Sequence, residues 1–158
     1  MVGGIELELD NYIGFILNNV TRKFSQFTVN FFKEYNITPE QAGIIRRLGE
    51  EEGITQKDLA IRMAKDQTNV TRLLDQLERK GLVMRNRNKD DKRSFLAYLT
   101  DEGKKLNEYI VPTEQEIMNI ALRGISEERK ALLKEIIGEI TENINLYSDL
   151  NGNNEKGQ

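Results

Sequence analysis

The amino-acid sequence predicts a mainly α-helical fold that contains one small β-hairpin. Apolar residues recur every three or four positions over most of the chain, which is the period of an amphipathic helix. Only between residues 82 and 99 does the pattern change to short extended runs. The 158 residues are a usual length for one domain, and 38% hydrophobic residues suffice for a core.

Long helices are expected at both ends of the chain. The first covers about residues 9–34, and its apolar stripe consists of Ile13, Ile16, Leu17, Val20, Phe24, Phe27 and Phe31. Two more cover about residues 101–124 and 126–150, with a kink expected near Tyr109 and Ile110 because Pro112 removes a backbone donor. Residues 151–158 have no large apolar side chain and are expected to be disordered.

Three shorter helices are predicted in the middle of the chain, each from its capping residue. Thr38, followed by a proline and a glutamine, opens a helix that ends near residue 50. Thr55 caps a short helix, and Asp66 caps the helix 67–80, which Gly81 ends. The expected inward residues are Ala42, Ile45, Leu48, Leu59, Ala60, Met63, Val70, Leu77 and either Leu73 or Leu74.

Two predicted strands follow, at residues 82–87 and 95–99, and they flank a charged loop at 88–94. Helix, turn, helix and a two-stranded ribbon form in this order the architecture of a winged helix-turn-helix. The sequence therefore predicts a winged domain at 37–100, with 1–36 and 101–150 as a helical dimerisation region. The alternative for the long helices is a monomeric helical core, but their stripes exceed what one small domain covers.

Charge is distributed unevenly along the chain. The net charge is −3, yet residues 62–93 contain ten basic and five acidic residues, which leaves the remainder at −8. A basic segment within an acidic scaffold favours a polyanionic partner for that segment.

Several classes of function are excluded by composition. Without cysteine or histidine, the sequence offers no thiolate zinc site, no thiol redox sensor and no serine-histidine triad, so no metal and no cofactor are expected. Glu50 and Glu52 are poor candidates for a catalytic pair because residues i and i+2 do not face each other on a helix. No apolar run reaches about 18 residues and the start lacks a signal-peptide pattern, so a cytoplasmic protein without a membrane partner is expected.

Two segments resemble the MarR family of transcription regulators. Residues 69–83 are similar to the family's recognition helix, with its closing leucine, basic pair, glycine and strand entry. Asp91-Lys92-Arg93-Ser94, Leu99-Thr100 and Gly103 resemble its wing signature, although Ala97 stands where the family has a larger aliphatic residue. The resemblance covers about residues 10–148. It implies a homodimeric, sequence-specific repressor of a pseudo-palindromic operator in double-stranded DNA, released by a small aromatic or lipophilic effector.

The candidate DNA contacts lie in the recognition helix and the ribbon. The first turns of a helix reach base edges in the major groove, and the polar residues available there are Gln67, Thr68, Asn69, Thr71 and Arg72. Phosphates and the minor groove are within reach of the ribbon residues Arg85, Arg87, Lys89, Lys92 and Arg93. The resemblance implies that Arg93 enters the minor groove while Asp91 fixes the loop near the guanidinium; a simple turn-forming role for Asp91 is the alternative.

Two other points stay open at this stage. The aromatic residues Tyr12, Phe15, Phe24, Tyr35 and Tyr109 are candidates to line an effector pocket, but helical spacing alone explains them and favours core positions. A helical protein-interaction module without DNA binding, whose basic ribbon meets an acidic partner, is the alternative function. A salt-dependent binding assay with duplex DNA separates the two functions.

Overall fold

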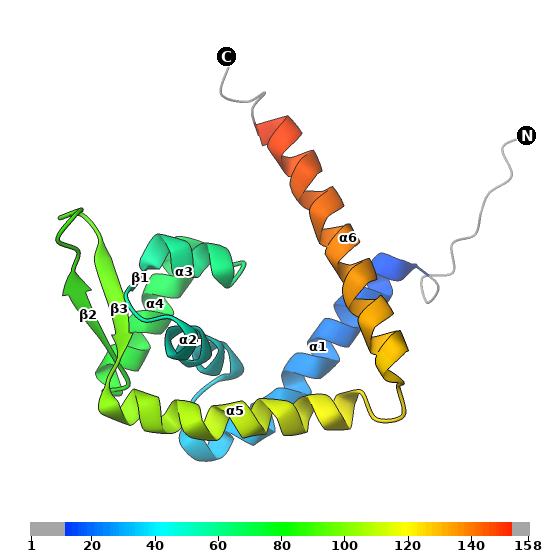
Figure 1. Cartoon of the computed structure of the whole chain (residues 1–158), viewed down its shortest axis with the longest axis horizontal. Helices are drawn as coiled ribbons and strands as arrows, with labels where there is room; N and C mark the ends of the chain where they lie inside the picture. Colours follow the sequence, from blue (N-terminus) through cyan, green and yellow to red (C-terminus); the bar gives the residue numbers. More distant parts are fainter. Residues whose placement is uncertain (1–11, 153–158) are drawn as a thin grey trace, which may run out of the picture. The chain divides into compact units, whose positions relative to one another are not determined.

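The computed structural model describes residues 12–152, and the side chains as far as 148. The chain separates into two compact units, one ending at Ile117 and one beginning at Met118. In order, the elements are α1 (Ile13–Phe32), the 3-10 helix η2 (Lys33–Tyr35), α2 (Pro39–Glu50), β1 (Ile54–Thr55), α3 (Gln56–Arg62), α4 (Gln67–Arg79), β2 (Val83–Arg87), β3 (Phe95–Leu99), α5 (Asp101–Ala121) and α6 (Glu127–Gly152) (Figure 1).

The predicted mainly helical winged fold is confirmed, with one addition to the sheet. The ribbon has three strands in the order β1-β3-β2, because Ile54 and Thr55 pair with Ala97 and Leu96 of β3. All pairs are antiparallel. Figure 1 shows the loop between β2 and β3 at the end of the sheet that is remote from the start of α5. Residues 83–99 are called the wing below.

The core lies among the helix-turn-helix and the sheet. Its largest fully buried side chains come from α2, α3, α4, β2 and α5: Ile44, Ile45, Leu48, Leu59, Leu73, Leu74, Leu77, Ile110, Val70 and Val83. Both Leu73 and Leu74 are therefore inward. Ala97 is fully buried between Arg85 and Ile54 in the sheet, so the small residue of the wing occupies a crowded central position.

The predicted helix starts are made by side-chain caps. Thr38 Oγ1 accepts the backbone N–H of Gln41, and the Gln41 side chain accepts that of Thr38, each at 3.2 Å, which completes a capping box. Thr55 Oγ1 accepts the N–H of Asp58 at 3.1 Å to begin α3. Gly81 has φ +70°, the left-handed conformation that ends α4.

The joint between the wing and α5 is made by backbone contacts. Thr100 donates its N–H to Leu82 O and its hydroxyl to Gly81 O, at 3.1 and 2.6 Å, and Thr100 Oγ1 accepts the N–H of Gly103. α5 therefore begins directly against the residues that follow α4. It continues as one helix through Pro112, and the expected kink stays a prediction.

The end of the chain differs slightly from the prediction. α6 extends to Gly152, so Asn151 and Gly152 belong to the helix rather than to the predicted tail, because each residue added to an existing helix gains a backbone hydrogen bond. Residues 153–158 lie outside the described residues, as do residues 1–11. None of the helices within residues 12–152 is long and apolar enough to cross a membrane.

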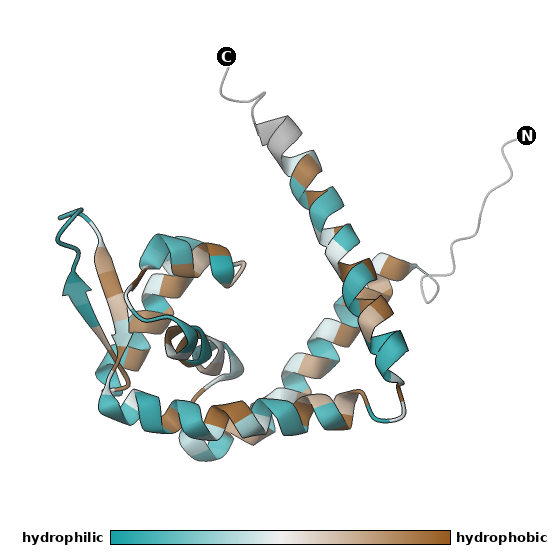
Figure 2. Ribbon diagram, in the orientation of Figure 1, coloured by the Kyte–Doolittle hydropathy of each residue, from teal (hydrophilic) through white to brown (hydrophobic). Residues whose placement is uncertain are grey.

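Apolar side chains are exposed along both α1 and α6, where Figure 2 shows hydrophobic bands alternating with hydrophilic ones. On α1, Ile13 is 65% exposed and Val20 59%. On α6, Leu132 is 53% exposed and Ile144 60%. Each helix therefore exposes apolar side chains, as is expected of a surface that forms an interface.

Candidate nucleic-acid interface

The predicted recognition helix, α4, begins at a cap that organises its first turn. Asp66 Oδ1 accepts the backbone N–H of Asn69 at 2.8 Å, and this hydrogen bond lowers the pKa of the Asp66 carboxyl. The turn before it contains Ala64 in the left-handed region, at φ +48°. This tight turn and the cap fix the direction in which α4 leaves α3.

The structure places the predicted base-reading residues on the first turns of α4. Gln67, Thr68 and Arg72 are exposed, and Asn69 is half-buried. The Arg72 guanidinium donates to Asn69 Oδ1 at 2.8 Å, so these two candidates form one polar pair. An arginine has five N–H donors in a fixed fork, and this pair leaves most of them available.

Thr71 has a different environment from the other candidates. Its hydroxyl donates to Gln67 O at 2.8 Å and accepts from the Gln56 side chain at 3.0 Å. Thr71 thus links α3 to α4. Sequence reasoning missed the contact of Gln56 with Thr71. The two residues lie 15 positions apart on different helices, so no local sequence pattern predicts it.

The tip of the wing is ordered by a network around Asp91. Asp91 Oδ1 accepts the backbone N–H of Arg93 at 2.9 Å, and Ser94 donates its hydroxyl to Asp91 O at 3.1 Å. Asn88 donates its N–H to Ser94 O across the base of the loop. The Asp91 carboxylate therefore binds the backbone of Arg93. Within residues 12–152, no ion pair joins the side chains of Asp91 and Arg93.

The cations of the wing fall into two groups. Within residues 12–152, no ion pair involves the exposed side chains of Arg87, Lys89, Lys92 and Arg93. Arg85 is held by α4, with its Nη2 2.6 Å from Asp75 and 2.5 Å from Glu78. The hydrogen bond to Glu78 raises the pKa of Arg85.

A hollow of about 300 Å³ separates the wing from the starts of α3 and α4. Its lining is mainly polar and consists of Thr55, Gln56, Lys57, Asp58, Gln67, Asn88, Asp91, Arg93, Ser94 and Phe95. It therefore brings the first residue of the recognition helix and the predicted minor-groove arginine to one surface.

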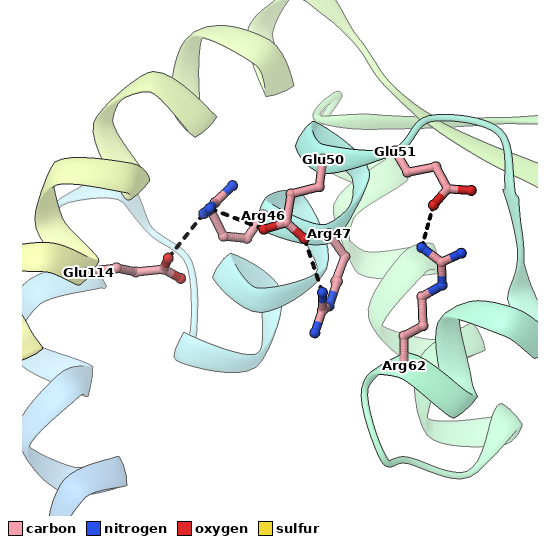
Figure 3. Close-up of polar contacts among 6 residues, drawn as sticks. All are labelled: Arg46, Arg47, Glu50, Glu51, Arg62 and Glu114. Carbon is pink, nitrogen blue, oxygen red and sulfur yellow. Dashed lines mark hydrogen bonds and ion pairs between the residues drawn. The ribbon is translucent and has the colours of Figure 1, made fainter. Parts of the chain in front are cut away.

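Three arginines elsewhere in the first unit, Arg46, Arg47 and Arg62, pair with carboxylates (Figure 3). Arg46 of α2 pairs with Glu50 and with Glu114 of α5, both at 3.1 Å. Burial raises the pKa of Glu114, although Arg46 opposes this shift. Arg47 also pairs with Glu50, and Arg62 of α3 with Glu51. Arg46 thereby joins α2 to α5, and Arg62 joins α3 to the end of α2, in contrast to the cations of the wing tip.

Comparison with known proteins decides the family. The model of the MarR family matches residues 37–95, from before α2 to the start of β3. The HTH-type transcriptional regulator FarR from Neisseria gonorrhoeae is 34% identical over 105 residues, which cover 66% of this chain and 72% of FarR. The chain belongs to the MarR family. The family resemblance of the recognition helix and wing is thus confirmed.

Solved structures of MarR-like fold include complexes with DNA. The Staphylococcus aureus MepR–DNA complex matches with a TM-score of 0.78 and 25% identity, and covers 84% of this chain and 98% of that one. A putative MarR regulator from Listeria monocytogenes, complexed with 26mer DNA, matches with a TM-score of 0.77 and 27% identity over 90% and 93% of the two chains. As a member of the MarR family, the chain is a winged-helix transcriptional regulator, and the family is not one of enzymes.

Proposed function

We propose that this MarR protein is a homodimeric repressor that binds a pseudo-palindromic site in double-stranded DNA. One observation carries the proposal: the first turns of α4 expose Gln67, Thr68 and Arg72 beside a wing tip whose cations are unpaired within the described chain. In this arrangement α4 enters the major groove and reads bases, while the wing lies on phosphates and the adjacent minor groove. The DNA complexes of the two structural relatives support it.

The proposed dimer rests on the exposed apolar stripes of α1 and α6. A soluble protein seldom leaves such stripes uncovered, and two-fold symmetric dimers are the commonest assemblies. Two-fold symmetry places two copies of α4 on two half-sites, whose centres lie about 34–36 Å apart or at multiples of that distance. This geometry gives the operator its pseudo-palindromic form.

Selection of bound duplexes from a random library tests the function directly. The expected product is a two-fold symmetric consensus, and recovery of unselected sequences would favour the protein-interaction module.

Arg72→Ala should lower affinity for the consensus by about 1–3 kcal/mol and relax the preference at one position in each half-site, because a base-edge contact carries sequence information. Arg79→Ala, in the last turn of the same helix, is the control and should leave the consensus unchanged. An equal loss on random DNA would assign Arg72 to the phosphates.

Arg93→Ala should weaken binding to nearly all duplexes. Each protomer contributes one wing, so the substitution removes two phosphate contacts and lowers the slope of log affinity against log salt by about two. Asp91→Ala should give a milder version, because it frees the Arg93 backbone that the carboxylate holds. Arg123→Ala, an exposed arginine after α5, is the control. An unchanged slope in a folded Arg93→Ala dimer would mean that the wing does not touch DNA.

The proposed signal is a small aromatic or lipophilic molecule that releases the DNA. The sequence has neither thiol nor imidazole to sense oxidants or metals. Tyr35 and Tyr109, two of the candidate aromatics, stack with centroids 6.0 Å apart, and Tyr109 is 58% exposed. Aromatic acids and lipophilic cations should therefore dissociate a preformed complex in a gel-shift titration. Reversible release by mild peroxide or micromolar zinc alone would contradict this assignment.

A further inference from the structure

Arg85 lies at the root of the wing and is joined to the recognition helix by a forked contact. It occupies β2 opposite Ala97, on the face of the sheet that meets α4. Its Nη2 donates to Asp75 at 2.6 Å and to Glu78 at 2.5 Å, and its Nε also donates to Glu78, at 3.2 Å. One guanidinium thus joins two carboxylates that lie three residues apart on α4.

We propose that Arg85 is a positioning residue that sets the angle between the wing and α4, and that it is not a phosphate contact. The proposal rests on the proposed DNA-binding function and gives this cation a different role from the other basic residues of the ribbon. Those residues are exposed and without ion pairs in the described chain, whereas the Arg85 side chain is 19% exposed.

The chemistry of the pair suits a fixed angle. A planar guanidinium with its donors in a rigid fork specifies direction as well as distance, which the point charge of a lysine does not. The contact also joins two elements that pack against each other and contribute Leu77 and Val83 to the same buried core. Because the wing and α4 must reach adjacent grooves at the same time, their relative angle decides whether both contacts form.

The charge of Arg85 also supports DNA binding, in addition to the angle that its contact sets. Asp75 and Glu78 lie on the helix that enters the groove, and a bare carboxylate there would repel the phosphates. Arg85 neutralises part of that charge in the free protein. If it left the carboxylates to bind a phosphate, both acidic side chains would lose this cation.

Arg87 provides a matched control, because it lies two residues further along the same strand and on the same face. The two roles predict opposite patterns of binding. For positioning, Arg85→Ala and the double substitution Asp75→Asn/Glu78→Gln should each weaken operator binding about tenfold, with the triple variant no weaker than either. The salt slope should change only slightly in all three, through the altered charge on α4, whereas Arg87→Ala should lower it by about two.

A phosphate contact predicts the reverse. Arg85→Ala would then lower the salt slope, and Asp75→Asn/Glu78→Gln would strengthen binding because it removes negative charge and frees the guanidinium. Arg85→Lys adds a further test, because it keeps the charge and loses the fork. Positioning predicts that this variant binds nearly as weakly as Arg85→Ala, and near-wild-type binding would overturn the proposal.

A measurement without DNA separates this proposal from the function on which it rests. The sequence has no cysteine, so spin labels can be attached at Thr68→Cys and Lys89→Cys, one on α4 and one on the wing loop. The distribution of distances between them should broaden in Arg85→Ala and in Asp75→Asn/Glu78→Gln, but not in Arg87→Ala. An unchanged distribution would overturn the positioning role. Failure of the unlabelled wild type to bind any selected duplex would instead overturn the proposed function.

Discussion

Replacing Gly103 with alanine is expected to destabilise the fold by about 3 kcal/mol, at the upper end of typical overpacking costs. A Cβ atom on Gly103 would lie 2.0 Å from the carbonyl oxygen of Leu82 and 3.3 Å from the Leu99 side chain. Because the first of these contacts is with backbone, no rotation of a side chain can relieve it. The start of α5 would have to move away from the residues that end the recognition helix.

Gly138 of α6 is the matched control, because a Cβ atom there would meet nothing within 4 Å. Gly138→Ala should therefore stabilise the helix by about 0.5–1 kcal/mol through the lower backbone entropy of alanine in the unfolded chain. Denaturant unfolding of both variants should be compared at one protein concentration, since a dimer's stability depends on it. Wild-type stability in Gly103→Ala would mean that the joint between the wing and α5 is free to shift.

The parts of the fold that the sequence predicts are those whose causes are local. Thr38, Thr55 and Asp66 each cap a helix within three residues, so side chain and partner appear together in the sequence. The apolar period of α4 identifies its buried face for the same reason. Gly81, which adopts a positive φ at the end of α4, is a local signal too.

The features that sequence reasoning missed depend on contacts between distant residues. β1 is only two residues long, and it is a strand because Ile54 and Thr55 pair with β3 more than 40 positions later. The ion pairs of Arg85 were not predicted either, because Arg85 and Arg87 are both basic residues of one predicted strand. Only the fold, which brings Asp75 and Glu78 against one of the two arginines, distinguishes them.

Charging the apolar face of α6 is expected to have the largest effect on DNA binding. Leu133 and Ile136 are 44% and 45% exposed in the single chain, and both lie on the apolar stripe of the helix. Leu133→Glu/Ile136→Glu should therefore leave each chain folded while preventing two copies from burying these faces against each other. Sedimentation at micromolar concentration should show a monomer, and circular dichroism should show unchanged helix content.

The same variant should lose about 10²–10⁴-fold in affinity for the full operator. In the dimer the second recognition helix binds from a high effective concentration, and a monomer loses that advantage without losing any contact to its own half-site. Affinity for an isolated half-site should therefore be similar in the variant and the wild type. Glu142→Ala, on the polar face of α6, is the control and should remain dimeric. A stable monomer that kept full operator affinity would overturn the proposed dimer. One α4 and one wing would then suffice to bind the operator, without a second copy of the chain.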